Sequence, residues 1–159
     1  MKHWWSLMAL ILSACATTPP ARLSGGPFST ITPSLARTRD LVGSRVRWGG
    51  TIAEVVPGKS ETCFQVVGRP LDSEARPEEG DSTEGRYIAC AAGFYDPAVY
   101  ASGREITVTG TLESPQPGRI GEYEYRFPRV SADEVYLWPR WEPAYYSPFW
   151  YSPGPWGPW

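Results

Sequence analysis

Alternation of apolar and polar residues is the feature that most constrains the fold of this chain. It runs through residues 105–112, which are rich in β-branched side chains, and through 120–127, where aromatic residues alternate with charged ones. A period of two is typical of a β-strand with one buried face. Similar runs occupy 45–56, 62–67 and 86–92, and 130–138 can continue the pairing of the last run. The sequence therefore predicts an all-β domain.

Five strands with little helix between them indicate a small OB-like five-stranded closed barrel, with an open β-sandwich as the alternative. The Gly49-Gly50 pair inside the first run is typical of a bulge or sharp bend. A short N-terminal helix is predicted at 33–42, because the Thr32 hydroxyl can cap it, Pro33 suits its first position and Gly43 can end it. A shorter helical turn is expected from Asp96-Pro97 to Gly103.

The N-terminal residues predict where in the cell the protein is located. An apolar run at 4–12 follows Met1-Lys2-His3 and is shorter than the roughly 20 residues that a membrane span needs. It ends in Leu12-Ser13-Ala14-Cys15, which is typical of a lipoprotein signal. The alternative is an ordinary signal peptide with an incidental cysteine. We expect lipid on Cys15, and Ala16 in place of an aspartate favours the outer membrane.

These signals divide the chain into four parts. Residues 1–14 are a predicted signal peptide, and 15–32 carry the lipidated cysteine and a flexible tether rich in Thr, Pro, Ser and Gly. Residues 33–138 form the predicted barrel. Residues 139–159 hold six prolines and eight aromatic residues, which indicates either a disordered tail or a contact segment for a membrane or a partner.

Composition argues against catalysis. His3 is the only histidine, and it leaves with the predicted signal peptide, which excludes His-based triads and His-liganded zinc from the mature chain. We expect a protein that is not an enzyme and has no cofactor and no metal. The mature chain is slightly acidic, so no nucleic-acid partner is expected. The acidic segment 69–85 lacks the spacing of a calcium loop and is predicted to be solvated.

Two cysteines remain after Cys15. In an oxidising compartment Cys63 and Cys90 favour a disulfide over two free thiols. Their local patterns conflict, however, because Cys63 alternates with Phe64 whereas Cys90 shares a face with Ile88. If both apolar sets pointed into one core, the two cysteines would face opposite ways unless a bulge shifted one strand.

Short motifs are spread along the chain. They are Val46-Arg47-Trp48-Gly49-Gly50, Gly85-Arg86-Tyr87, Gly93-Phe94-Tyr95-Asp96-Pro97 with Tyr100, Gly103-Arg104, Gly118 to Tyr125, and Leu137-Trp138-Pro139. Together with the lipoprotein signal they resemble the Slp family of starvation-inducible outer-membrane lipoproteins, from the signal to about Pro139. The resemblance implies a lipid-anchored envelope module, facing the periplasm and linked to starvation or stationary phase, and it supplies no catalytic residues. The Cys63 and Cys90 pair and the aromatic tail are not features that the resemblance implies.

Three functions remain open. The first is a non-enzymatic structural or interaction module whose partner is an envelope protein or a polysaccharide. The second is an OB-type module that binds an oligosaccharide or an anionic envelope polymer, and the third is a carboxylate-based hydrolase. The second needs a shared ligand face, although the same residues also suit core packing and structural ion pairs. The candidates for that face are Arg47, Trp48, Arg86, Tyr87, Tyr95, Tyr100 and Arg104.

Overall fold

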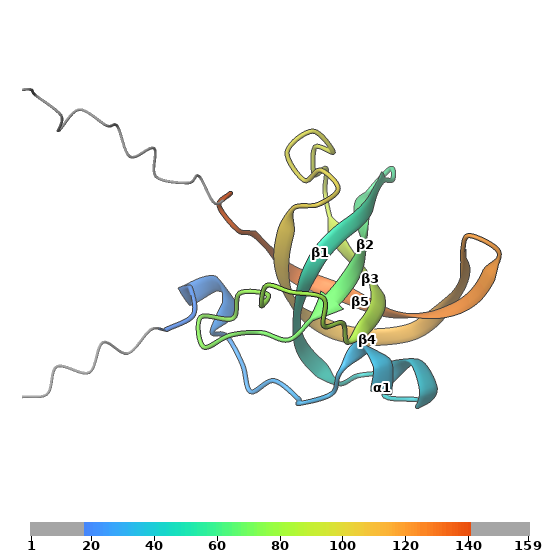
Figure 1. Cartoon of the computed structure of the whole chain (residues 1–159), viewed down its shortest axis with the longest axis horizontal. Helices are drawn as coiled ribbons and strands as arrows, with labels where there is room; N and C mark the ends of the chain where they lie inside the picture. Colours follow the sequence, from blue (N-terminus) through green and yellow to red (C-terminus); the bar gives the residue numbers. More distant parts are fainter. Residues whose placement is uncertain (1–17, 141–159) are drawn as a thin grey trace, which may run out of the picture.

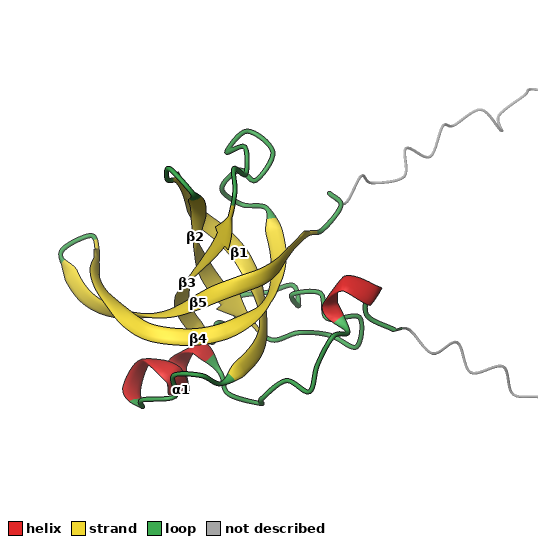
Figure 2. Cartoon of the chain, turned by 180° about the vertical axis from the view of Figure 1, so that it is seen from behind, coloured by secondary structure: helices red, strands yellow, loops and turns green. Residues whose placement is uncertain are grey.

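The computed structural model describes residues 18–140, so the predicted signal peptide, Cys15 and the tail beyond Arg140 lie outside the described residues. Five strands and one short α-helix confirm the all-β class (Figures 1 and 2). No helix among the described residues is long and apolar enough to cross a membrane. In chain order the elements are η1 Ala21–Leu23, α1 Pro33–Thr38, β1 Arg45–Pro57, β2 Glu61–Arg69, β3 Gly85–Ala92, β4 Glu105–Ile120 and β5 Tyr123–Leu137.

The strands pair in a ring, β1-β2-β3-β5-β4, and β4 returns to β1 to close the barrel. Only β3 and β5 run parallel to each other in this ring, whereas the other four pairings of the described strands are antiparallel. Strand β1 pairs with both β2 and β4 and bends strongly between them. A Cβ atom at Gly50 would collide with the carbonyl oxygen of Val67, so the close approach of the two strands requires glycine there. The bulge itself lies two residues later, between Ile52 and Glu54.

The inward faces of all five strands form one core. Ile52 and Phe64 come from β1 and β2, Tyr87 and Ala89 from β3, and Val108 from β4. Along β2 and β3 these residues alternate with residues that point outward, and on β3 the outward set includes Ile88. This main core explains why the barrel is stable without long helices.

Helix α1 packs against the core through Ala36 and begins where it was predicted, since the Thr32 hydroxyl accepts a hydrogen bond from the backbone N–H of Leu35 over 3.3 Å. The expected extension to residue 42 was wrong. Arg39 is extended, and the chain then turns so that Leu41 packs against the core from a loop. Tertiary packing of Leu41 therefore outweighs the helical pattern.

The helical turn expected after Asp96-Pro97 is present as one hydrogen-bonded turn. The N–H of Tyr100 donates to the carbonyl of Asp96 over 2.9 Å, and the Asp96 carboxylate accepts a hydrogen bond from the N–H of Ala98 over 2.8 Å. By contrast, the segment 69–85, predicted as a solvated acidic loop, folds onto the barrel. Its Ala75 is fully buried, and Asp72 accepts hydrogen bonds from the backbone N–H groups of Glu74 and Arg76, which tightens the turn.

The predicted flexible tether is also largely ordered from Pro20 onward. Leu23 in η1 is fully buried, and the N–H of Ser29 donates to the carbonyl of Arg45 over 2.8 Å. The indole N–H of Trp48 donates to the carbonyl of Ile31 over 2.6 Å. The sequence missed this packing because Thr, Pro, Ser and Gly in the segment suit a free linker equally well.

Strands β4 and β5 extend beyond the barrel as a long curled hairpin, with Ile120 paired to Tyr123 at its tip. In Figures 1 and 2 the hairpin projects from the side of the barrel away from the two ends of the described chain. The prediction ended one strand at residue 112 and began the next at 120, whereas β4 continues to Ile120 and β5 begins at Tyr123 after a turn at 121–122.

Candidate functional site: an arginine pocket and an apolar groove

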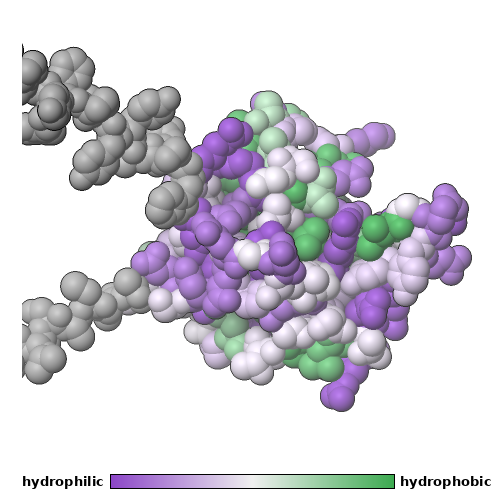
Figure 3. Space-filling view, in the orientation of Figure 1, coloured by the Kyte–Doolittle hydropathy of each residue, from purple (hydrophilic) through white to green (hydrophobic). Residues whose placement is uncertain are grey.

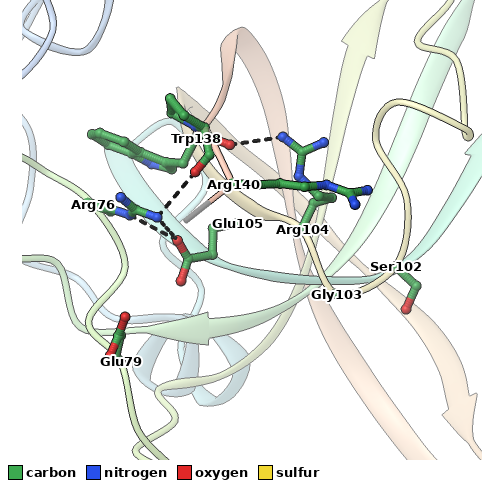
Figure 4. A pocket seen from close by; sticks show the side chains of 9 residues that line it. Arg76, Glu79, Ser102, Gly103, Arg104, Glu105, Trp138 and Arg140 are labelled. Atoms are coloured by element: carbon green, nitrogen blue, oxygen red, sulfur yellow. Dashed lines mark hydrogen bonds and ion pairs between the residues drawn. The ribbon is translucent and has the colours of Figure 1, made fainter. Parts of the chain in front are cut away.

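An arginine pocket lies where β5 ends and β4 begins. Its hollow has a volume of about 450 Å³. Arg76 comes from the loop after β2, Arg104 and Glu105 from the point where the chain enters β4, and Trp138 and Arg140 from the segment just after β5. Figure 4 shows these side chains around the hollow. The pocket thus combines segments that are far apart in the sequence.

Arg76 is held in place from two sides. Its Nε and Nη2 atoms both donate to Oε2 of Glu105, over 2.9 and 2.8 Å. Its guanidinium carbon lies 5.5 Å from the ring centroid of Trp138, within the range of a cation–π contact. Because Glu105 already accepts two charged hydrogen bonds, it serves the pocket as an ion-pair partner rather than as a free base.

Arg104 and Arg140 leave positive charge in the same pocket. Arg104 donates to the carbonyl oxygens of Val99 over 3.0 Å and Trp138 over 2.9 Å, which orients the guanidinium without neutralising it. Neither Arg104 nor Arg140 forms an ion pair within residues 18–140. Glu79 is the other carboxylate that lines the hollow. The arrangement suits an anion with several oxygen atoms.

A second hollow, the apolar groove, has a volume of about 380 Å³ and lies between the β1–β2–β3 face and the β4–β5 hairpin. Val56, Ile88 and Phe127 supply apolar surface, and Val56 is 54% exposed. The remaining lining residues are Glu54, Gly58, Glu61, Cys63, Gln65, Gln116, Pro117, Gly118, Arg119 and Arg129.

Arg129 closes one wall of the groove. Its guanidinium donates to Glu61 on β2 over 3.0 Å and to Glu113 on β4 over 2.9 Å. Burial alone lowers the pKa of Arg129, but the hydrogen bonds to Glu113 and Glu61 outweigh it and raise that pKa above its ordinary value. Arg129 therefore remains charged and ties the base of the hairpin to the barrel.

The structure joins Cys63 and Cys90 in a disulfide beside this groove. The two residues lie directly opposite each other in the β2–β3 ladder, with their Cα atoms 4.0 Å apart. The expected conflict between their faces does not arise, because Ile88 points outward with Cys90 while Tyr87 and Ala89 face the core. The error lay in assigning Ile88 to the core face.

Glu61, Cys63 and Cys90 are close enough to resemble a metal-ligand set, with their ligand atoms within 4.8 Å of one another. Thiolates are the ligands that such a set would need. The disulfide uses both sulfur atoms and Glu61 is bound to Arg129, so the oxidised protein does not offer these groups to a metal.

The aromatic members of the expected ligand face do not line one surface, and for two of them the prediction was wrong. Trp48 is 4% exposed and Tyr87 fully buried, with their rings 5.1 Å apart in the core. Tyr95 and Tyr100 pack edge to face with each other and against Phe64 at the end of the core. Alternation alone could not separate a buried aromatic from a surface one.

The arginines of that expected face are dispersed as well. Arg47 donates to the carbonyl of Leu23 over 3.1 Å, and Arg86 donates to the side chain of Gln65 over 2.8 Å on another part of the barrel. Of the seven candidates only Arg104 lines the arginine pocket. Its neighbours there, Arg76 and Arg140, had no distinguishing pattern in the sequence.

Together these features describe a small β-barrel protein with an ordered segment before the first strand and with surface hollows that include the arginine pocket and the apolar groove. The chain belongs to the Slp family of outer membrane lipoproteins, whose model matches residues 12–159. It is 30% identical to the outer membrane protein Slp of Escherichia coli K12, over 94% of this chain and 85% of that protein. It is 31% identical to the uncharacterized lipoprotein YeaY of the same organism, over 92% of this chain and 87% of that protein.

Among solved structures, the chain is similar to a small single-stranded DNA-binding protein from Streptomyces coelicolor. The identity is 13%, the TM-score is 0.36, and the match covers 60% of this chain and 94% of the other.

Proposed function

We propose that this protein is a non-enzymatic, lipid-anchored module of the outer membrane, which presents an OB-type barrel to the periplasm and acts by contact with an envelope partner. The family supports the outer-membrane address. The sequence Leu12-Ser13-Ala14-Cys15 supports lipid on Cys15. The link to starvation or stationary phase rests on the resemblance of the sequence motifs to the starvation-inducible lipoproteins.

One observation carries the non-enzymatic part of the proposal. Two carboxylates line each hollow, and in each case an arginine binds one of them: Glu105 is held by Arg76 in the pocket, and Glu61 by Arg129 in the groove. A carboxylate-based hydrolase needs two carboxyl groups about 5–10 Å apart with one able to give up a proton. The ion pairs favour a structural role for Glu105 and Glu61, and this supports a module that acts by contact rather than by hydrolysis.

The apolar groove is the surface best suited to an envelope partner, because it is partly apolar and lies at the base of the projecting hairpin. A photo-crosslinking amino acid at Val56 should capture a specific partner in intact cells. The same group at Val42, which is equally exposed but outside the groove, is the matched control. Identical adducts at both positions would contradict a partner in the groove.

The anchor and the regulation have separate tests. Labelling cells with a palmitate analogue should mark the native chain and leave a Cys15→Ala variant unmarked, and label on that variant would refute lipidation at Cys15.

The abundance of the protein should rise when cells exhaust their carbon source, as measured by immunoblot against growing cells. A constant abundance would argue against the starvation link.

A second candidate function is binding of an anionic envelope polymer in the arginine pocket. It is favoured by Arg104 and Arg140, whose charges are unpaired within the described residues. A phosphorylated oligosaccharide should bind in a titration calorimeter and lose affinity in Arg140→Gln, while the neutral oligosaccharide should not bind. Equal heats for both sugars would exclude this candidate.

A further inference from the structure

The arginine pocket lies on the side of the barrel from which the N-terminal segment leaves. Trp138 connects the two places. Its carbonyl accepts a hydrogen bond from Arg104 of the pocket over 2.9 Å, and it packs with Leu23 and Ala75 in a second small core, where it is 6% exposed and they are fully buried. Figures 1 and 2 show the start and the end of the described chain on one side, with the hairpin on the other. The pocket is therefore fixed to the segment that leads to Cys15.

Few residues separate this segment from the proposed lipid. The Ser24 hydroxyl donates to the carbonyl of Pro19 over 3.3 Å, so the chain is held beside the end of η1 from Pro19 onward. Cys15 precedes Pro19 by four positions, and an extended chain covers at most about 14 Å over that length. If Cys15 carries lipid, as proposed above, this side of the barrel lies close to the lipid headgroups.

The surface on this side suits headgroups rather than acyl chains. In Figure 3 the face next to the point where the chain ends leave is largely hydrophilic. The pocket itself is lined by three arginines and two glutamates, which gives it a net charge of +1. A positive hollow beside a bilayer attracts anionic headgroups more strongly than zwitterionic ones.

The charges inside the pocket are separated. Arg76 is paired with Glu105 over 2.8 Å, so these two charges largely cancel. Figure 4 shows the guanidinium groups of Arg104 and Arg140 on one side of the hollow and Glu79 on the other. An anion beside the two unpaired arginines is thus not opposed directly by a carboxylate.

The donors that remain match a phosphate group. A guanidinium has several N–H donors in one plane and can give two parallel hydrogen bonds to the oxygens of one phosphate. The carbonyls of Val99 and Trp138 use only two of the donors of Arg104 and hold its side chain in place. Arg140 is exposed and can turn toward the bound group. The volume of about 450 Å³ suits one headgroup better than a long run of polymer.

From these observations we propose that the arginine pocket binds the phosphate of an anionic phospholipid headgroup, such as phosphatidylglycerol, in the bilayer that holds the lipid on Cys15. The proposal rests on the proposed lipid anchor for the position of the pocket near the bilayer. This position favours a headgroup over the anionic polymer considered above. Two attachments at one side of the barrel hold a protein more firmly than one and also fix its orientation, so the hairpin points away from the membrane.

The test uses residues 15–159 with Cys15→Ser, so that no acyl chain contributes. We expect sedimentation with vesicles of phosphatidylcholine and phosphatidylglycerol at about two to one, and little with phosphatidylcholine alone. Arg140→Gln should lower this binding about fivefold, which is the contribution of one arginine near an anionic surface. Arg104→Gln combined with Arg140→Gln should lower it at least about tenfold.

Two controls make the result specific. Arg39→Gln with Arg126→Gln removes the same charge from exposed arginines outside the pocket, and should change vesicle binding less than about twofold. Inorganic phosphate or a phosphorylated oligosaccharide, each at about 1 mM, should release less than half of the bound protein, because a vesicle presents many headgroups on one surface. Arg140 has no hydrogen-bond partner among residues 18–140, so Arg140→Gln should keep the urea midpoint of the native chain.

Three results would overturn the proposal. They are native vesicle binding by Arg140→Gln, an equal loss in the Arg39 and Arg126 variant, which would show general attraction of charge, and release of most of the protein by the oligosaccharide or by phosphate, which would assign the pocket to a soluble anion or polymer. Failure of palmitate labelling at Cys15 would refute the lipid anchor and leave this vesicle result intact, so the two outcomes are distinguishable.

Discussion

The indole N–H of Trp138 donates to the hydroxyl oxygen of Thr107 over 2.9 Å, and that hydroxyl donates to the carbonyl of Ala75 over 2.7 Å. Thr107 is fully buried on β4. This relay of two hydrogen bonds therefore connects the segment after β5 to the loop after β2, beside the small core of Leu23, Ala75 and Trp138. Thr107→Val would leave a buried N–H and a buried carbonyl without partners. Each such loss costs about 1–3 kcal/mol, and a urea titration should show unfolding at a lower midpoint.

Thr111→Val provides the control for this prediction. Thr111 lies on the same strand but is partly exposed, so solvent can replace what its hydroxyl loses. Its exchange should change the free energy of unfolding by less than about 0.5 kcal/mol. Equal destabilisation by both variants would show that valine on β4, rather than the relay, causes the effect.

Reduction of the disulfide should destabilise the barrel. Cys63 and Cys90 are 27 positions apart, and closing a loop of that size stabilises a protein by about 3–4 kcal/mol in the chain-entropy model. The native chain should therefore unfold at a lower urea concentration after reductant is added. The double variant Cys63→Ser with Cys90→Ser should unfold near the reduced midpoint and not respond to reductant. A native midpoint insensitive to reductant would contradict the disulfide.

Removing the hydroxyl of Tyr87 should be neutral or stabilising. This oxygen is fully buried and has no hydrogen-bond partner in the part of the chain that the structure describes, and burial followed by the charge of Glu84 raises the pKa of the phenol. Tyr87→Phe keeps the ring against Trp48 and should change stability between zero and about +1 kcal/mol. Trp48→Phe, by contrast, removes a donor that is bonded to Ile31 and should be destabilising. A large loss in Tyr87→Phe would reveal a partner for the hydroxyl, such as a buried water molecule.

Stability should depend on pH through Glu84. Burial, and after it the charge of Glu78, raises the pKa of the Glu84 carboxyl above its ordinary 4.5. The folded protein therefore holds this proton more tightly than the unfolded chain does. The resulting stabilisation is complete below about pH 4.5 and is lost as the pH rises through the raised pKa. Glu84→Gln should remove this dependence and unfold at a higher midpoint than the native chain at pH 7.

Glu78→Gln separates the two causes. It removes only the neighbouring charge, so the pH at which Glu84 loses its proton should move part of the way toward 4.5. Denaturation midpoints collected from pH 4 to pH 8 would show this as a displaced transition. If both variants follow the native curve, Glu84 is not responsible for the dependence.

The sequence predicted the strands well because one face of each is buried, and alternation reports burial directly. The run containing Phe64 has this clear period in its burial, whereas in Glu105 to Leu112 the sequence alternates but Thr107 and Thr109 on the other face are buried as well. It predicted the site poorly, because the arginine pocket is assembled from Arg76, Arg104 and Arg140 in three distant segments. Their contact depends on how the loop after β2 folds back onto Trp138, and no local pattern encodes that contact.

The same limit explains the errors at Ile88 and Trp48. Alternation shows which residues of a strand share a face, but not which of the two faces is buried. On β1 and β3 that is decided by the packing of Trp48 against Tyr87 in the core, which leaves Ile88 on the outer face. Ordering of the segment before α1 was missed for a related reason. Its partners, the backbone of Arg45 and the ring of Trp48, are distant in sequence and are brought near only by the folded barrel.

The hairpin that extends beyond the barrel affects whether neighbouring copies of this protein associate at high density. Lipid anchors would confine copies of this protein to a plane at high local density, and a two-stranded ribbon with open edges invites strand addition between neighbouring copies. Pro115 and Pro117 remove two backbone donors from one of these edges. Charged residues such as Arg119, Glu122 and Arg126 cluster at the tip, where they favour hydration over stacking. These prolines and charges therefore oppose pairing between the hairpins of neighbouring copies, so the hairpin can project from the barrel without forming a shared sheet.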